Sequence, residues 1–264
     1  MRRDSIHITL LAFGALLMRA QTSGVEANNR GVDLRLASRP ADAVPEFNRA
    51  IQVAENSGDD RLLATALAGL GSALVDLGEL ARAQPVLRRS LALFEKVAGP
   101  DSLETGEAAN NLAMLYRKTG ELLKAQTQLE RALPLMQAHL DVHDMQLALA
   151  FNNMFILLVE QKQWDSAESY LKQAREIAKA HPESPQLADI EENRALLLAH
   201  RGQYPEAVEA MRQVLQIEQH TLRPDDPRLA RSLESYASYL RKISQKSEAR
   251  EAELRAQSIR RAGS

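Results

Sequence analysis

Apolar positions recur along this chain in a pattern that predicts pairs of helices. The most regular marker is an alanine, with separations of 40, 42, 42, 40 and 42 residues between successive copies. The six copies are Ala43, Ala83, Ala125, Ala167, Ala207 and Ala249. A large apolar residue follows each of the first five by four positions, and a mostly small residue follows by seven, as Phe47 and Ala50 follow the first. These offsets place the positions on one face of a helix.

A second helix is predicted upstream of each alanine. A small residue usually stands twelve positions before it and a large apolar residue nine before, as with Ala113 and Tyr116 ahead of Ala125. Five positions before it stands a residue expected to end the first helix in a left-handed conformation, which glycine tolerates best. These are Ser38, Gly78, Gly120, Lys162, Gly202 and Ser244. Small residues on both helices allow the backbones to approach, so each repeat is predicted to be helix, turn, helix.

The links between repeats carry turn residues, such as Gly99-Pro100-Asp101 and the run from Arg223 to Pro227. One helix pair cannot bury its apolar faces alone, but six stacked pairs can. The sequence therefore predicts an all-α fold, a right-handed α-solenoid with a concave groove. Its six units are expected at about 25–57, 60–98, 101–140, 143–181, 184–222 and 225–262.

The third repeat resembles the tetratricopeptide signature. The residues that carry the resemblance are Leu112, Ala113, Tyr116, Gly120, Ala125, Leu129 and Ala132. The period is longer than the usual length of about 34 residues, and Gly99-Pro100-Asp101 followed by the run from Ala109 to Tyr116 is similar to the kinesin-light-chain subtype. The resemblance covers roughly residues 25–262 and is strongest in repeats three and four. It implies a protein that binds a protein or peptide.

A row of asparagines is the main candidate for a binding surface. Fourteen positions before the alanines stand Asn29, Gly69, Asn111, Asn153, Asn193 and Ser235. Asparagine is a mediocre helix former, so its recurrence inside a helix needs a reason. The resemblance implies that Asn111, Asn153 and Asn193 line the groove and hydrogen-bond the main chain of an extended peptide. An amide offers both donors and an acceptor for that purpose.

Two points about this row stay open. Asn110 and Asn152, one position earlier, are further candidates, although Ala68, Glu192 and Glu234 interrupt their row. Buried amides are usually satisfied within the protein, so the asparagines could instead bond the neighbouring repeat and hold the stack together.

Charge along the predicted groove is mixed. Arg117 and Lys118 in repeat three are candidate groove residues, but acidic residues occupy comparable places in repeats two and four. Such a mixture is more typical of a solvated face than of a clamp for phosphate or carboxylate. The formal net charge is −2 and the sequence pI is about 6.3, so no general affinity for nucleic acid or anionic membranes is expected.

The chain offers little catalytic chemistry. It has no Cys, which removes thiol nucleophiles and cysteine-ligated zinc. His139 and His143 have a spacing that can bind zinc on a helix, but they fall where a second helix ends and a link begins. No phosphate-binding glycine loop or nucleophile elbow is present. We expect no enzyme, metal or cofactor, but either a protein-binding scaffold or an accessory subunit that docks an enzyme on another chain.

The first 20 residues have the layout of a secretory signal peptide. Arg2 and Arg3 precede a mostly apolar run from Ile6 to Met18, which is shorter than the ~20 residues that a transmembrane helix needs. Residues 1–20 are therefore predicted to be removed, leaving residues 21–264 as an exported, periplasmic or secreted solenoid without a membrane span. Met18 stands where a small residue is usual, so the alternative is an N-terminal helix of a cytoplasmic protein.

Export can be tested on protein purified from its native host. Mass spectrometry is expected to find an N-terminus close to Gln21, because Ala20 is the small residue at the end of the predicted signal peptide. Recovery of the chain with an intact Met1 in a cytosolic fraction would show that residues 1–20 are not a signal peptide.

Overall fold

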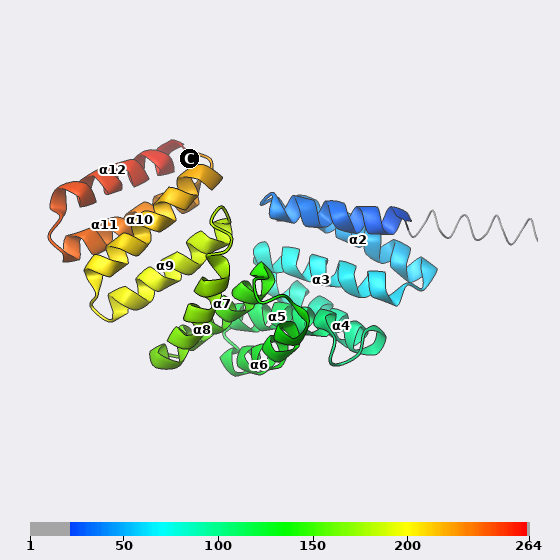
Figure 1. Cartoon of the computed structure of the whole chain (residues 1–264). Coiled ribbons are helices and arrows are strands. Elements are labelled where there is room, and N and C mark those ends of the chain that lie inside the picture. Colours follow the sequence, from blue (N-terminus) through cyan, green and yellow to red (C-terminus); the bar gives the residue numbers. More distant parts are fainter. Residues whose placement is uncertain (1–21, 263–264) are drawn as a thin grey trace, which may run out of the picture. The chain divides into compact units, whose positions relative to one another are not determined.

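The computed structural model describes residues 22–262, and this range is helical with short connections and contains no strand (Figure 1). The chain divides after His139 into two compact parts, which are treated separately below as the N-terminal part and the C-terminal part. The predicted signal peptide, residues 1–20, lies outside the described residues.

Six consecutive helix pairs make up the described chain. The N-terminal part holds helical residues 22–36 with α2 (Pro40–Ser57), α3 (Asp60–Asp76) with α4 (Leu80–Val97), and α5 (Leu103–Lys118) with α6 (Leu122–His139). The C-terminal part holds α7 (Met145–Glu160) with α8 (Trp164–Ala178), α9 (Pro185–His200) with α10 (Tyr204–Thr221), and α11 (Pro227–Lys242) with α12 (Lys246–Ala262). The predicted all-α fold of six helix–turn–helix units is confirmed.

The first helix of each of repeats two to six starts at a side chain that caps it. Ser or Asp oxygens accept hydrogen bonds from backbone N–H groups in the first turn and so satisfy donors that have no partner inside the helix. The capping residues are Asp59, Ser102, Asp144, Ser184 and Asp226. The second helices α2, α4, α8 and α10 have no such side-chain cap. The links therefore fix where each repeat begins.

The turn inside each repeat has the conformation that the sequence predicted. All six residues placed five positions before the alanines have positive φ, and three of them are not glycine. Their φ angles are 58° at Ser38, 76° at Gly78, 79° at Gly120, 63° at Lys162, 76° at Gly202 and 64° at Ser244. A left-handed residue here ends the first helix and reverses the chain direction.

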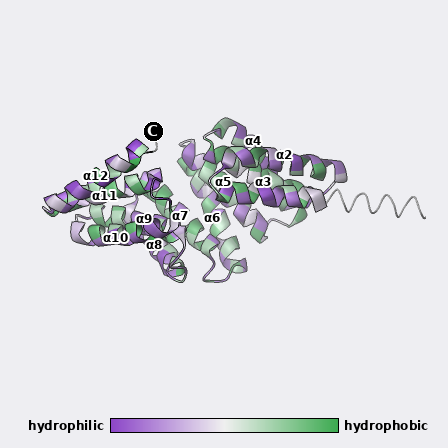
Figure 2. Ribbon diagram, turned by 90° about the horizontal axis from the view of Figure 1, so that it is seen from above, coloured by the Kyte–Doolittle hydropathy of each residue, from purple (hydrophilic) through white to green (hydrophobic). Residues whose placement is uncertain are grey.

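The six marker alanines form the tightest points of the helix pairs. Each is only 0% or 1% exposed. Fully or almost fully buried side chains follow four positions later in the first five repeats: Phe47, Leu87, Leu129, Leu171 and Met211. Figure 2 shows hydrophobic and hydrophilic residues mixed along the helices, and a helix such as α4 buries its apolar positions on one face.

Glycine is required at two positions in repeat two. A Cβ atom on Gly71 would lie 2.4 Å from Leu87 Cδ2, and one on Gly69 would lie 2.2 Å from Phe47 Cε1. Both distances are far shorter than any van der Waals contact. The large side chains of α2 and α4 therefore occupy space that exists only because α3 has no side chains there.

Overpacking at a marker alanine tests this register. Replacing Ala125 with Leu is expected to lower the free energy of unfolding by about 1–3 kcal/mol, because the site has no room for three more carbon atoms. Denaturant unfolding followed by circular dichroism measures the change. Leu123→Ala is the matched control, since Leu123 on the same helix is 79% exposed and its loss is expected to be nearly neutral. A neutral Ala125→Leu would show that the assigned helix register is wrong.

Candidate functional site

The asparagine row stands on the first helices of the repeats, where water can reach it. Asn29 is exposed, and Asn111, Asn153 and Asn193 are half-buried. Asn110 is also half-buried, whereas Asn152 is buried. The positions fourteen before the alanines are therefore the more accessible of the two neighbouring rows.

One pair in these rows joins adjacent repeats. Asn193 Nδ2 on α9 donates to Asn152 Oδ1 on α7 over 2.8 Å. For this pair, the structure therefore shows the structural role that the sequence left open, a hydrogen bond that links neighbouring repeats. In the N-terminal part the equivalent donor is missing, because repeat two has Gly69 at that position. Asn28 corresponds to Asn152, and its buried Oδ1 has no hydrogen-bond partner.

The remaining predicted residues differ in their surroundings. The side-chain amide of Asn111, in the interior of α5, makes no hydrogen bond with another described residue. Asn110, Asn153 and Arg117 each have partners of their own. Lys118 ends α5 and is exposed. Asn111 is therefore the asparagine of repeat three whose amide is available to a ligand.

In the C-terminal part, Asn193 belongs to a wider accessible face of α9. Residues at spacings of three, four, seven and eleven share that face. They are Asp189, Glu192, Asn193, Leu196 and His200. Leu196 is 40% exposed. The ring of His200 stacks on that of Trp164 with 3.7 Å between the centroids. This face thus offers carboxylates, an amide, an apolar side chain and an aromatic pair in sequence along two to three turns.

Three carboxyl groups in this region have a pKa above the ordinary value. Burial raises the pKa of Glu192, and the nearby charge of Asp189 raises it further. The pKa of Asp189 is also raised, because protein atoms displace water from around a side chain that still retains exposed surface. Neither side chain makes an ion pair or hydrogen bond within the described chain. Their charges are therefore not neutralised by a direct partner.

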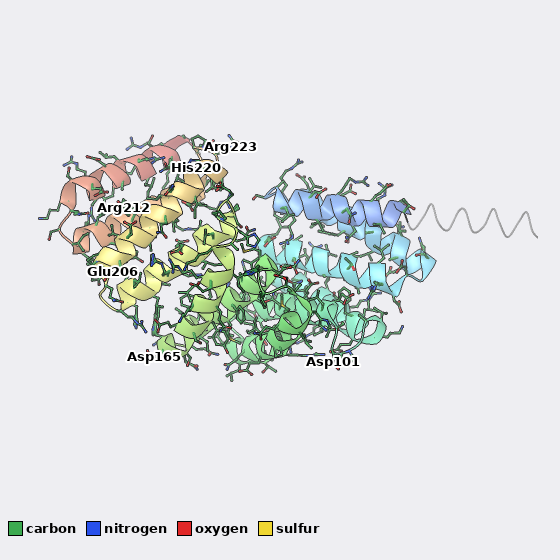
Figure 3. All side chains as sticks on the ribbon, viewed as in Figure 1. Asp101, Asp165, Glu206, Arg212, His220 and Arg223 are labelled. Carbon is green, nitrogen blue, oxygen red and sulfur yellow. The ribbon has the colours of Figure 1, made fainter. Side chains whose placement is uncertain are left out.

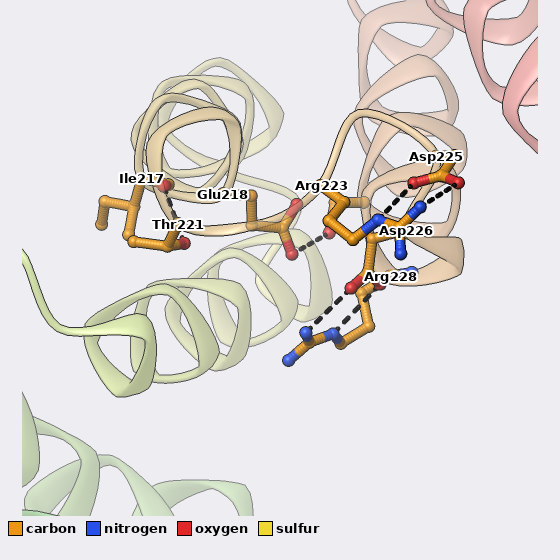
Figure 4. A network of polar contacts seen from close by, with 8 residues as sticks. Ile217, Glu218, Thr221, Arg223, Asp225, Asp226 and Arg228 are labelled. Carbon is orange, nitrogen blue, oxygen red and sulfur yellow. Dashed lines mark hydrogen bonds and ion pairs between the residues drawn. The ribbon is translucent and has the colours of Figure 1, made fainter. Parts of the chain in front are cut away.

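The third carboxyl group belongs to Glu218, near the end of α10. Its Oε1 accepts a hydrogen bond of 2.9 Å from Ser232 Oγ on α11, while its Oε2 is buried without a partner (Figure 4). Burial is the main cause of its raised pKa, and the charges of Glu192 and Asp189 add to the effect. The charged groups at the end of α10 and in the N-terminal halves of α9 and α11 therefore influence one another, and they are called the electrostatic cluster below.

Two arginines of α11 face the same cluster. Arg228 is held by Asp226, with contacts of 3.1 Å to Oδ1 and 2.9 Å to Oδ2 (Figure 4). That pairing keeps the pKa of Asp226 below its usual value. Arg231 is exposed, and its charge acts on Asp189 and Glu192 without a contact within 4.0 Å. The arginines moderate the negative potential but do not pair with the three carboxylates.

Several other charged groups of the C-terminal part are paired with side chains of neighbouring helices. Glu191 is 2% exposed and accepts from Arg175 Nε at 2.5 Å and from Arg194 Nε at 2.6 Å, which ties α8 to α9. Arg212 donates to the Tyr236 hydroxyl at 2.8 Å, and Tyr236 donates to Glu248 at 2.5 Å; Figure 3 places Arg212 on α10. These contacts satisfy both carboxylates and hold the helices together.

Of the two histidines considered for zinc, the ring of His139 contacts a backbone carbonyl, and His143 offers its own backbone carbonyl to another histidine. His139 Nε2 lies 2.9 Å from the carbonyl oxygen of Asp101, and the backbone carbonyl of His143 lies 2.7 Å from His181 Nε2. Across residues 22–262, no group of three or more His, Asp or Glu side chains is arranged to hold a metal ion. Over the same range, every helix is too short or too polar to cross a membrane.

Sequence reasoning missed the three carboxylates as a group. In the sequence, Glu192 stands at the position that Asn110 and Asn152 occupy in their repeats. This change from asparagine to glutamate was the available signal. Asp189 and Glu192 are three apart on one predicted helix, so their proximity could have been found. Glu218 could not, because it lies on α10 and only the folded pairing of α10 with α9 brings the two helices together.

Comparison with known proteins agrees with this architecture. A family model described as tetratricopeptide repeat matches residues 25–96, 62–138, 104–180, 144–217 and 186–262. The search of curated proteins finds no significant match.

Several solved structures have the same fold. BtubC (BKLC) from P. vanneervenii has a TM-score of 0.66 and 20% identity, covering 93% of this chain and 91% of its own. A kinesin light chain-like protein of nearly identical TPR-like repeats from Podosopora anserina has a TM-score of 0.61 and 22% identity, covering 76% and 95%. A Rap protein complexed with Competence and Sporulation Factor has a TM-score of 0.69 and 15% identity, covering 91% and 75%. The predicted α-solenoid class is confirmed, and the chain belongs to the tetratricopeptide repeat family.

Proposed function

We propose that this chain is an exported adaptor that holds an extended segment of another protein against the first helices of its repeats. The chain has the tetratricopeptide scaffold fold, and its family serves mainly in protein interaction. In this proposal the chain performs no catalysis itself. Its slightly acidic balance, with a net charge of −2, favours a protein partner over nucleic acid.

The observation that carries the proposal is the state of Asn111. Its amide lies in a helix interior, where asparagine costs roughly 0.5 kcal/mol relative to alanine, and it makes no hydrogen bond with another described residue. A polar group that costs helix stability and stabilises no internal contact is available for a ligand. An amide can donate to a peptide carbonyl and accept from a peptide N–H without requiring one side chain.

In the C-terminal part, the accessible face of α9 also supports binding of an extended protein segment. It presents Leu196 and the Trp164–His200 stack beside Asn193, so side chains of a bound segment would find an apolar contact next to a polar one. Such mixtures of an apolar surface with a few polar groups are typical of peptide-binding sites.

Two solved neighbours support a docking role by analogy of fold. One is the Rap protein complexed with Competence and Sporulation Factor, and the other is the hetero-tetramer Cut9–Hcn1 of APC/C. The second structure also favours the alternative function, an accessory subunit that docks another chain of an assembly. Identification of proteins that copurify from the native host separates the two. A catalytic subunit in the complex supports the alternative.

Export belongs to the proposal because of Arg2, Arg3 and the apolar run that follows them. An exported adaptor of this kind suits the assembly of proteins in the cell envelope.

Substitution of the asparagines tests the proposed binding surface. Peptides are selected on the full chain from a random dodecapeptide display library, and the tightest is titrated by calorimetry. Changing Asn111 and Asn153 together to Ala is expected to weaken binding by about 5- to 150-fold, if each lost hydrogen bond contributes ~0.5–1.5 kcal/mol and the losses add. Unchanged affinity of a folded double variant would place the ligand elsewhere, and failure to select any peptide would contradict the proposal.

Asn193 provides the structural comparison. Replacing it with Ala removes its 2.8 Å bond to Asn152 and leaves a buried amide oxygen without a donor. This is expected to lower the free energy of unfolding by about 1–3 kcal/mol. Asn111→Ala is expected to leave thermal melting unchanged or slightly raised. If Asn111→Ala destabilises the fold as much as Asn193→Ala, the two asparagines share a structural role.

A further inference from the structure

We propose that a cleft between α8 and α9 binds a small organic acid through the guanidinium groups of Arg175 and Arg194. These two residues are called the arginine pair below. The cleft lies wholly within the C-terminal part of the chain. The inference is independent of the proposed function, because it concerns a second site away from the asparagine row.

Three charged residues at the junction of α8 and α9 interrupt the apolar pattern of the repeats. Arg175 stands eight positions after the marker alanine of repeat four, and Glu191 and Arg194 stand sixteen and thirteen positions before that of repeat five. Most other repeats have apolar residues at these positions, Gln257 and Arg30 being the exceptions. They are Ile51, Leu91, Leu133 and Leu215 for the first position, Ala27, Leu67, Ala109, Phe151 and Leu233 for the second, and Leu70, Leu112, Met154 and Tyr236 for the third. Stacking of repeats therefore does not require charges here, where removal from water makes them costly.

The arginine pair shares one carboxylate. Glu191 is 2% exposed and accepts from Arg175 Nε at 2.5 Å and from Arg194 Nε at 2.6 Å. Two guanidinium groups thus face one carboxylate, which leaves one positive charge without a counterpart. The arginine side chains are only 26% and 23% exposed, so solvent ions screen this charge less than a charge on the open surface.

The terminal nitrogens of the arginine pair are available to a ligand. In both residues only Nε contacts Glu191, and the Nη atoms make no hydrogen bond or ion pair with another described residue. None of these Nη atoms is buried, so each remains in contact with solvent. A guanidinium presents its donors in a fixed planar fork that matches a carboxylate. Glu191 therefore holds two forks in place without occupying their outer donors.

Both arginines line a cleft with a volume of about 510 Å³, a size typical of small-molecule sites. Its other lining residues include Leu171 and Leu197, which are buried, and Leu198, which is half-buried. Lys172 also lines the cleft and makes no ion pair within the described chain. Cationic donors beside apolar side chains suit a ligand that combines a carboxylate with an apolar body.

The acidic residues of the cleft leave the arginine pair free. Both oxygens of Glu168 accept from Arg201, over 2.7 and 2.8 Å, and Glu176 accepts from Lys179 over 2.7 Å. The side chain of Asp165 is fully exposed and its nearest cation is Arg201, at 4.0 Å. A ligand carboxylate at the arginine pair would therefore displace no existing ion pair.

The test titrates the full chain with 3-phenylpropanoate, followed by calorimetry. Binding with a Kd of about 1 mM or tighter is expected for an acid of this size. The neutral amide of the same acid, and propanoate, which lacks the phenyl group, are each expected to bind at least about tenfold more weakly, because one lacks the charge and the other the apolar body.

Arg194→Leu is the decisive variant. It introduces the residue that repeats two and three have at this position, and it leaves one guanidinium facing one carboxylate. Affinity for the acid is expected to fall about tenfold or more, whereas the melting temperature stays equal or rises. Arg260→Gln is the matched control, because it removes one positive charge from α12, where Arg260 is paired with Glu234 over 2.7 Å. Its affinity for the acid is expected to equal that of wild type.

Glu191→Gln gives the test its direction. This change leaves both guanidinium groups without their carboxylate, so the melting temperature is expected to fall. The acid then supplies the missing negative charge, and it is expected to raise the melting temperature of this variant by more than that of wild type. An equal or smaller rise would contradict the proposed position of the carboxylate.

The other outcomes also decide the inference. Equal affinities for the acid and its amide, tighter binding of inorganic phosphate than of the acid, or wild-type affinity of the Arg194→Leu variant would each overturn it. The double substitution of Asn111 and Asn153 to Ala is expected to leave binding of the acid unchanged. Failure of peptide selection therefore contradicts only the adaptor function, and failure of the acid to bind contradicts only this site.

Discussion

The contact between a small residue on one helix and a large side chain on the next sets the geometry of every repeat. The marker alanines are completely or almost completely buried, and the positions around them allow two backbones to approach closely. The approach is closest in repeat two, where Leu87 and Phe47 lie directly against glycines of α3 and leave no room for a Cβ atom there. Residues that do not take part in this packing, such as Asn111 on α5 and Leu196 on α9, keep exposed surface on the first helices. The candidate binding surfaces consist of such residues.

Close packing also determines which polar groups find partners. Asn193 bonds Asn152 across two repeats, whereas Asn28 has an unpartnered oxygen because Gly69 stands where a donor would be. Gly69 is there because Phe47 needs its space. A packing requirement in one repeat thus removes a hydrogen bond from the row beside it. The asparagine row is consequently part scaffold and part candidate site, and the two roles fall on different repeats.

Much of the fold follows from local signals in the sequence. Ser38, Lys162 and Ser244 take left-handed conformations as their register predicted, although none is glycine. The alanine spacing located the helix pairs because helical periodicity is a local property of the chain. The division of the asparagines could not be predicted in this way. Whether Asn193 or Asn111 has a partner depends on which residue of an adjacent repeat faces it, and one sequence does not reveal that pairing.

The three carboxyl groups with a raised pKa illustrate the same limit. Asp189 and Glu192 were visible as neighbours on one helix, but Glu218 lies on α10, and its hydrogen bond with Ser232 of α11 exists only in the folded chain. Its charge matters because it is buried, and burial is a property of the folded chain. Residues that interrupt a repeat pattern, as Glu192 interrupts the asparagines, are therefore worth examining in the structure before they are dismissed as variation.

Hydrogen–deuterium exchange with a bound peptide tests the central claim most directly, that the accessible faces of the first helices hold the partner. The account predicts that saturation with the tightest selected peptide slows amide exchange in first helices such as α5 and α9, and leaves the second helices α8 and α10 unchanged apart from the last turn of α10. Protection confined to α8 and α10, with no change in the first helices, would contradict it.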